Sequence, residues 1–175
     1  MSYDLKLEIE DSAALDEIKH KPGQLAKALQ RAVRKTHKWL QRQIITGIAK
    51  EILVGQKHVK PRIYSDFDNK TLTGKVWVGL NPISARRAGE PRQTSLGAKA
   101  GKYFFPGAFV VRIKNGPANV FKRVGRERLP IKREMIDIDV PGRLVLHRLE
   151  NQVKQYFNRR LNEEINYALN VETAK

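Results

Sequence analysis

The sequence contains no cysteine, which excludes disulfide bonds, thiolate metal sites and a cysteine nucleophile. Its uninterrupted apolar runs are only a few residues long, whereas a membrane-spanning helix needs roughly 20. The first residues, MSYDLKLEIEDSAALDE, are acidic and alternating, which is the opposite of a signal peptide with its basic start and apolar centre. We therefore expect a protein that is cytoplasmic or part of a soluble particle.

Acidic residues are scarce outside the first 20 positions. The 175 residues include 34 Lys or Arg against 18 Asp or Glu, a net charge of +16, and the isoelectric point is about 10.2. Residues 1–20 hold six acids and two basic residues, so this stretch is at −4 and the remainder at +20. Such a field attracts nucleic acid or acidic protein surfaces. The segment 1–20 is either a strand with an acidic polar face or an acidic arm that binds a basic surface of its own or a neighbouring subunit.

Apolar residues recur at steps of three and four in two long stretches, the period of a helix that buries one face. Pro22 suits a first helical turn, and Gly55 suits a left-handed stop after the last turn. We predict helices over about 22–54 and about 142–170. The apolar positions are Leu25, Leu29, Val33, Leu40, Ile44, Ile48 and Ile52 in the first stretch, and Val145, Leu149, Val153, Tyr156, Phe157, Leu161, Ile165 and Leu169 in the second.

The first predicted helix has a strongly cationic polar face. A face of this kind is usually solvated, but here almost no acids lie among the cations to form i, i+4 pairs. The face is therefore either simply solvated or a surface for an anionic partner. Its cations are Lys27, Arg31, Arg34, Lys35, Lys38 and Arg42.

Between the helices the hydrophobic period changes toward two, the period of strands. The stretches KPRIYSDFD, LTGKVWVGL, GAFVVRIK and ANVFKRVG predict four strands, and YDLKLEIE predicts a fifth at the N-terminus. We predict an α+β fold in which an antiparallel β-sheet with a long β-hairpin is packed by the two helices. The length favours a single domain over 1–175. Trp77 and Val78 alternate across the sheet, so one of them should face the core.

Residues 84–103 predict a flexible basic loop. The stretch has three glycines, one proline, five basic residues and almost no large apolar side chain. Long loops without internal structure are uncommon in compact domains and tend to be functional or to become ordered on assembly. The segment is therefore either a contact made during assembly or an ordinary surface loop without such a role.

The stretch GAFVVRIKNGPANVFKRVGRERLPI predicts a basic hairpin. Asn115 and Gly116 signal a tight turn, but Pro117 lacks the N–H that would close it, so the loop should extend to about Ala118 or Asn119. Alternation places Phe109, Val111 and Ile113 on one face as core, and the other face becomes basic toward Arg112 and Lys114.

The sequence offers little support for catalysis. Its four histidines are scattered without a carboxylate or second histidine at metal-ligand spacing, and we find no phosphate-binding glycine loop or nucleophile elbow. Glu163 and Glu164 are adjacent on a predicted helix and point in different directions, so they do not form an acid/base pair. Charge alone can give nonspecific nucleic-acid affinity, although no recognition signature accompanies it. A free-standing basic nucleic-acid-binding module is therefore the alternative function.

The order of several stretches resembles a known family. A long helix containing ALQRAVRKTHKWLQRQI, a connector VGQKHVKPRI, the hairpin and a C-terminal helix together resemble the bacteriophage minor tail protein Z family, also called tail completion proteins. The most telling stretches are GAFV at 107–110, VFKR at 120–123 and RLPI at 128–131. The resemblance extends over nearly the whole chain from Pro22 onward.

The resemblance implies a structural virion or prophage protein that acts late in tail assembly and helps the tail to join the head. It implies no catalytic residue, no cofactor and no metal. The implied partners are other phage tail or neck proteins, further copies of the chain, and DNA, with no membrane; the implied location is the host cytoplasm during assembly and then the virion tail. The candidate partner-binding residues are Arg112, Lys114, Lys122, Arg123, Arg126, Arg128, Arg86, Arg87 and Arg92. We expect the hairpin to be rigid and to expose its cationic side chains to an assembly partner, unless its arginines pair with acids of the same subunit.

Overall fold

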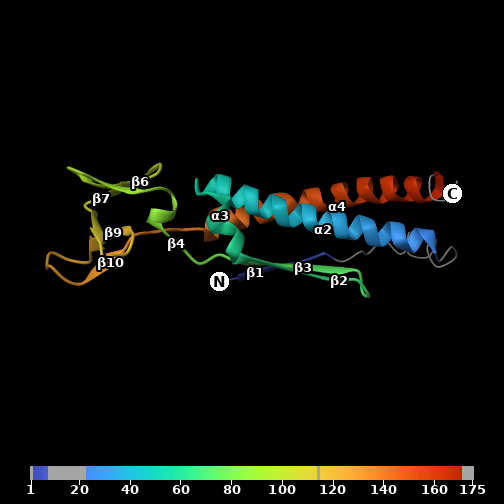
Figure 1. Cartoon of the computed structure of the whole chain (residues 1–175), viewed down its shortest axis with the longest axis horizontal. Helices are drawn as coiled ribbons and strands as arrows, with labels where there is room; N and C mark the ends of the chain where they lie inside the picture. Colours follow the sequence, from blue (N-terminus) through green and yellow to red (C-terminus); the bar gives the residue numbers. More distant parts are fainter. Residues whose placement is uncertain (1, 8–22, 114, 171–175) are drawn as a thin grey trace. The chain divides into compact units, whose positions relative to one another are not determined.

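A computed structural model describes residues 2–7, 23–113 and 115–170. Its elements give the predicted α+β fold, with antiparallel strands and two long helices (Figure 1). The sequence predicted one domain, and the chain divides into two compact units. Of the described residues, unit 1 contains 45–62, 79–113 and 115–143, and unit 2 contains 2–7, 23–44, 63–78 and 144–170. Most of the acidic segment 1–20, from Glu8 onward, and Lys114 lie outside the described residues.

Unit 2 is a helix pair with a three-stranded sheet. It contains most of α2 (Gln24–Glu51), most of α4 (Asp139–Asn170), β1 (Ser2–Leu7), β2 (Ile63–Asp68) and β3 (Thr73–Gly79). The strand order is β1-β3-β2, and β2 pairs antiparallel with β3. Val78 is buried and Trp77 is exposed, so the predicted alternation on β3 is confirmed.

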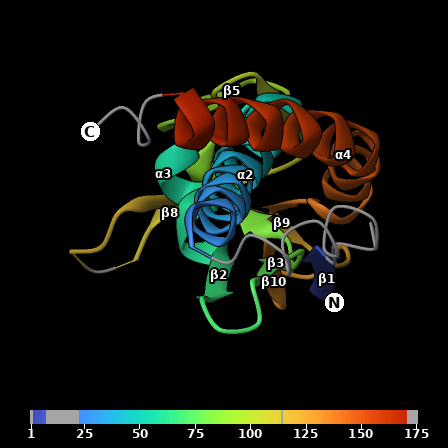
Figure 2. The same cartoon turned by 90° about the vertical axis from the view of Figure 1, so that its right-hand side faces the viewer.

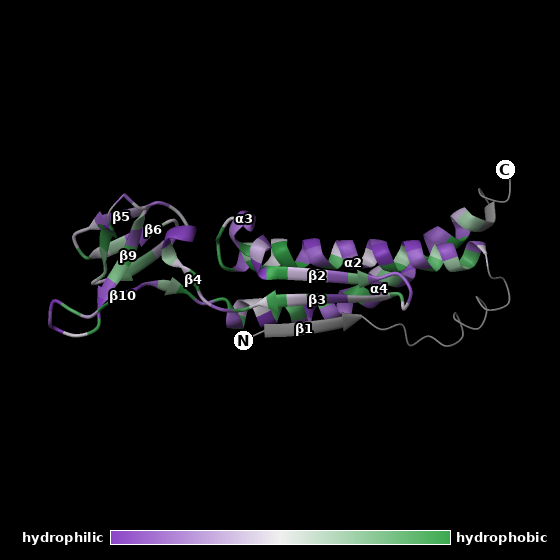
Figure 3. Cartoon of the chain, turned by 60° about the horizontal axis from the view of Figure 1, so that its bottom comes forward, coloured by the Kyte–Doolittle hydropathy of each residue, from purple (hydrophilic) through white to green (hydrophobic). Residues whose placement is uncertain are grey.

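Both predicted helices are present, with shifted ends. Hydrophilic and hydrophobic residues alternate along α2 at helical spacing (Figure 3), and Leu29, Val33 and Leu40 are buried. The expected left-handed stop at Gly55 is wrong. Leu53 adopts the left-handed conformation, with φ of 48°, because the helix ends earlier and the N–H of buried Val54 donates to the Ala49 carbonyl at 3.0 Å. None of the described helices has the length and hydropathy to cross a bilayer.

The helices α2 and α4 lie side by side in unit 2 (Figures 1 and 2), joined by an aromatic stack and a charge cluster. The rings of Trp39 and Tyr156 stack with centroids 4.2 Å apart. Glu164 is 6% exposed and accepts bonds from Arg31, at 2.6 Å, and from Lys35. Two cations of the face that we expected to lack acidic partners therefore pair across the helices. Glu163 points elsewhere and pairs with Arg160, as its position on the helix predicted.

Unit 1 is made of short strands around small helical turns. Its 3-stranded sheets have the orders β5-β6-β7 and β10-β9-β8, and β11 pairs with β4. The turns are α3 (Gln56–Val59), η1 (Lys60–Arg62) and η2 (Ala85–Arg87). The strands are β4 (Ile83–Ser84), β5 (Pro91–Thr94), β6 (Gly97–Ala100), β7 (Tyr103–Pro106), β8 (Phe109–Arg112), β9 (Ala118–Arg123), β10 (Ile131–Arg133) and β11 (Met135–Ile136).

The expectation of an irregular loop over 84–103 is corrected by this arrangement. The segment contains η2, β5 and β6, and β5 pairs with β6 from Pro91↔Ala100 to Thr94↔Gly97. The sequence did not show these strands, because β6 (GAKA) is rich in alanine and glycine, which have low β-propensity, and β5 (PRQT) has no alternation of apolar residues. Tertiary contacts form them, because β5 packs on β8 and β9 and β6 packs on β8 and η2.

The core between these sheets is built from small side chains. Ala85, Ala98, Ala100, Ala108 and Val120 form one buried cluster, against which Phe105 and Val110 pack. The predicted hairpin is present, and Arg112 pairs with Ala118 across a loop of 113–117, as Pro117 indicated. Its core face is corrected, however. Ala108 and Val110 face the cluster, whereas Ile113 is 53% exposed.

A substitution at Gly101 tests how strongly this close packing constrains the fold of unit 1. The φ of Gly101 is +57°, and a Cβ there would lie 2.2 Å from the Ala88 carbonyl oxygen, which is backbone that cannot swing away. We expect Gly101→Ala to lower the free energy of unfolding by at least about 2 kcal/mol, measured by denaturant unfolding. Gly125→Ala is the matched control, since a Cβ there meets nothing within 4 Å. Equal stability of the two variants would contradict the close packing.

Glu164 tests the charge cluster of unit 2. We expect Glu164→Gln to cost about 1–3 kcal/mol of unfolding free energy, because Arg31 and Lys35 lose a buried acceptor. Glu163→Gln, at an exposed pair, should cost less than about 1 kcal/mol. An equal cost for the two variants would show that the buried carboxylate has no special role.

The same cluster predicts a pH dependence of stability. Burial raises the Glu164 pKa, but the hydrogen bonds from Lys35 and Arg31 outweigh burial, so the pKa lies below its ordinary value of 4.5. The stabilisation by Glu164 is therefore complete above about pH 4.5 and is lost as pH falls through the lowered pKa. Denaturant unfolding of wild type and Glu164→Gln at several pH values should show their difference shrinking below pH 4.5. A constant difference down to pH 3 would contradict this account.

Candidate functional site

Both units are basic, and unit 1 carries the larger net charge among the described residues. Its described residues hold 17 Lys or Arg against six Asp or Glu, a net +11, and those of unit 2 hold 13 against six, a net +7. The described residues between Gly79 and Ile138 contain no ion pair within 4 Å. The hypothesis that the hairpin arginines pair with acids of the same subunit is therefore wrong for the described residues. Within the described part of unit 1, Arg143 pairs with Asp139 at 3.0 Å, whereas the cations between Gly79 and Ile138 have no carboxylate partner.

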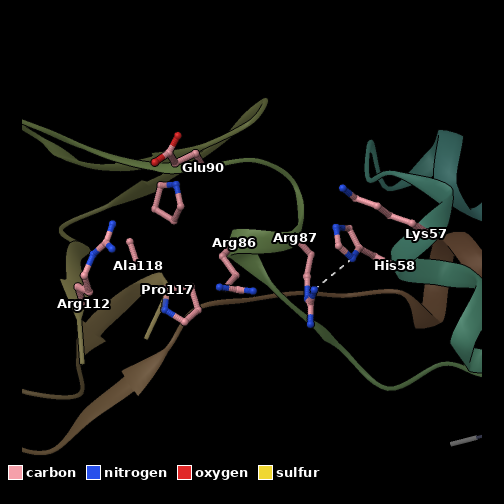
Figure 4. A pocket seen from close by; sticks show the side chains of 9 residues that line it. Lys57, His58, Arg86, Arg87, Glu90, Arg112, Pro117 and Ala118 are labelled. Atoms are coloured by element: carbon pink, nitrogen blue, oxygen red, sulfur yellow. Dashed lines mark hydrogen bonds between the residues drawn. The ribbon is translucent and has the colours of Figure 1, made fainter. Parts of the chain in front are cut away.

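A cavity of about 500 Å³ gathers several of these cations (Figure 4). Arg86 and Arg87 come from η2, which follows β4 directly, and Arg112 comes from the end of β8. Lys57 and His58 come from α3. Glu90, Pro91, Pro117 and Ala118 complete the lining, so one carboxylate and a few apolar groups stand among five basic side chains.

The pKa of His58 reflects the charges around the cavity. Burial lowers this pKa, and the charges of Arg87, Lys57 and Arg86 lower it further. Arg87 Nη1 donates to His58 Nδ1 over 3.3 Å, which requires an imidazole with a free lone pair on that nitrogen. The three cations that help to lower this pKa form a positive field at the cavity, and the same field favours a bound anion.

A second group of cations lies where β9 meets β10. We define the tip loop as residues 124–130, all of which are exposed. It holds Arg126 and Arg128 beside Val124, 54% exposed, and Leu129, 67% exposed. Just before the loop, Arg123 lies over the Phe109 ring at 5.9 Å, which limits its freedom. This end of the sheet therefore combines unpaired arginines with exposed aliphatic side chains.

The predicted site residues thus fall into two separate groups. Arg86, Arg87 and Arg112 meet at the cavity, whereas Arg123, Arg126 and Arg128 lie at the other end of β9. Ala118, the partner of Arg112, and Arg123 are five residues apart on β9, which is about 17 Å at about 3.3 Å per residue. The two groups therefore cannot bind one small ligand together.

The remaining predicted residues lie elsewhere in unit 1. Lys122 stands directly opposite Lys132 on the neighbouring strand, an unfavourable pair of like charges unless an anion lies near. Arg92 lines a separate, smaller cavity with Glu90 and Lys99. Lys114 lies outside the described residues.

Sequence reasoning missed Lys57 and His58 as site residues. The signal was the basic stretch QKHVKPR at 56–62, which we used only as a connector. Histidines were judged as metal ligands, and among the described residues no group of three potential ligands comes together. His37, in contrast, is structural: it is buried, and its Nε2 lies 2.5 Å from Ser65 Oγ.

Comparison with known proteins identifies the family. Residues 10–174 match the family model described as prophage minor tail protein Z (GPZ), which is nearly the whole chain. Neither the curated proteins nor the solved structures give a significant match. The resemblance drawn from the hairpin and helix stretches is thereby confirmed. The chain belongs to the prophage minor tail protein Z family and has a structural role in the phage tail.

Proposed function

We propose that this protein completes the phage tail and prepares it to join the head, without catalysis, through protein contacts made by unit 1. The proposal extends the family's structural role in the tail to a late assembly step. The observation that carries it is the β9–β10 end of the sheet, where Arg123, Arg126 and Arg128 have no acidic partner among the described residues.

The composition of the tip loop supports a protein partner. Arginine is enriched in protein interfaces, and residues that contribute most to binding energy are often arginines surrounded by apolar groups. Val124 and Leu129 supply such groups, and both are exposed in the isolated chain. A surface that only binds phosphates needs cations but has no use for an exposed leucine between them.

The alternative is a free-standing basic nucleic-acid-binding module. The net charge of +11 on the described residues of unit 1 will give low-salt DNA affinity in any case, so binding as such does not decide between the functions. The two functions differ in which residues matter. A diffuse electrostatic surface depends on total charge, whereas a protein interface depends on particular side chains.

The test uses tail assembly in cells that depend on a plasmid-borne copy of the gene. We expect Arg126→Ala or Arg128→Ala to cost about 1–4 kcal/mol of partner binding each and so to reduce head-joined tails about tenfold or more, counted by electron microscopy. Lys27→Ala removes an equal charge from an exposed position of α2 and should leave the count nearly unchanged.

Low-salt DNA binding by the purified variants separates the two functions. We expect the tip-loop variants and Lys27→Ala to bind DNA almost equally, with affinity falling steeply as salt rises. Intact assembly by the tip-loop variants together with lost DNA binding would reject the proposed function and support the nucleic-acid module. Equal assembly defects in all three variants would show a general charge effect and also reject it.

A further inference from the structure

The cavity of unit 1 has a different chemistry from the tip loop. Its lining carries four permanent cations, Lys57, Arg86, Arg87 and Arg112, from three separate elements. Arg86 and Arg112 have no hydrogen bond or ion pair with any described residue, so their guanidinium forks are open. Guanidinium forks match the two oxygens of a carboxylate or phosphate.

We propose that this cavity is a binding site for the carboxylates of an acidic protein segment. The inference rests on the proposed function, because it names the chemistry of one protein contact of unit 1. A volume of about 500 Å³ is larger than one oxyanion requires and lies in the range of pockets that enclose several groups. The ligand is therefore a short peptide with more than one acidic side chain.

Three features of the lining favour a peptide over nucleic acid. Glu90 repels a continuous run of phosphates, but it can accept a bond from a peptide N–H. Pro91, Pro117 and Ala118 offer apolar contact to a peptide side chain. The lining contains no Phe, Tyr or Trp on which an unpaired base could stack.

The pKa of His58 can report whether a ligand is bound in the cavity. Arg87, Lys57 and Arg86 lower this pKa by repulsion, so carboxylates that neutralise them will raise it. Arg87 can then turn from His58 Nδ1 to the incoming oxygens, which frees that nitrogen for a proton. Binding should therefore couple to proton uptake by His58.

The test measures binding of a labelled peptide EIEDSAALDE, the sequence of residues 8–17, which has five acids and no basic residue. The receptor is the full chain with those acids replaced by amides (Glu8→Gln, Glu10→Gln, Asp11→Asn, Asp16→Asn and Glu17→Gln), so that its own segment does not compete. We expect saturable binding by fluorescence anisotropy and a rise in the His58 pKa by NMR. A peptide with the same five positions as amides should not bind.

Receptor variants decide whether the cavity or the overall charge binds the peptide. Arg86→Ala or Arg112→Ala should weaken binding about tenfold or more, and Arg112→Lys should rescue it only partly, because lysine lacks the fork. Arg126→Ala, an equal loss of charge at the far end of β9, should change affinity less than about twofold. Unfolding midpoints equal to that of the parent chain confirm that each variant is folded.

Any of three results would overturn the proposal. They are absence of peptide binding, equal weakening by Arg126→Ala and Arg112→Ala, and a short DNA duplex or inorganic phosphate that binds while the peptide does not. The proposed function stands or falls separately. Tip-loop variants that fail to complete tails would still support it if the cavity bound no peptide, and a peptide-binding cavity would not rescue it if those variants assembled normally.

Discussion

The close approach of backbones around the alanine cluster is the constraint on which unit 1 depends. Ala98 and Ala100 on β6 face Ala108 and Val120, and these small side chains allow the two sheets to lie near each other. Gln93 then joins the sheets, because its side-chain amide donates to the Gly97 carbonyl at 2.8 Å and accepts from the Val110 N–H at 2.9 Å. A core of this kind leaves no room inside for long side chains. Arg112 and Arg123 accordingly stand at the last positions of β8 and β9, and Arg86 and Arg87 stand on the turn η2.

The scarcity of acids gives this arrangement its electrostatic character. The buried carboxylate of Glu164 neutralises Arg31 and Lys35 between the helices of unit 2, where it stabilises the fold. Unit 1 has no comparable carboxylate inside its sheets. Among its described cations, Arg133 lies over the Phe121 ring at 5.8 Å, and Lys122 faces Lys132 on the neighbouring strand. The cations of unit 1 are therefore the residues on which the proposed partner contact rests.

Patterns with a clear period predicted their part of the fold from sequence. Apolar steps of three and four predicted both helices, and alternation predicted β2, β3, β8 and β9. In long amphipathic segments, the spacing of apolar residues shows directly which side chains are buried. The strands β5 and β6 could not be predicted in this way. Ala98 and Ala100 of β6 become part of a core only by packing against Ala108 and Val120, and Gly101 is needed because its backbone lies against that of Ala88.

The candidate site was predicted only as a set of cations. The sequence indicated Arg112 and Arg126 as candidates in one basic hairpin stretch, and the antiparallel path of β9 places them at opposite ends. Arg86 and Arg87 join Arg112 only because η2 follows β4 beside β9. Lys57 and His58 arrive from α3, a turn of four residues too short to show a period. Periodicity can be seen within one stretch of the sequence, but the grouping in space of residues far apart in the chain cannot.

The central claim is that the exposed cations of unit 1 contact protein in the assembled tail. A photo-crosslinking amino acid at position 129 reports this directly, because Leu129 is 67% exposed between Arg128 and Pro130. After irradiation of purified tails, we predict a discrete adduct with a tail or neck protein, and none from the same label at the exposed position 27 of α2. Adducts with DNA alone, or equal adducts from both positions, would contradict the account.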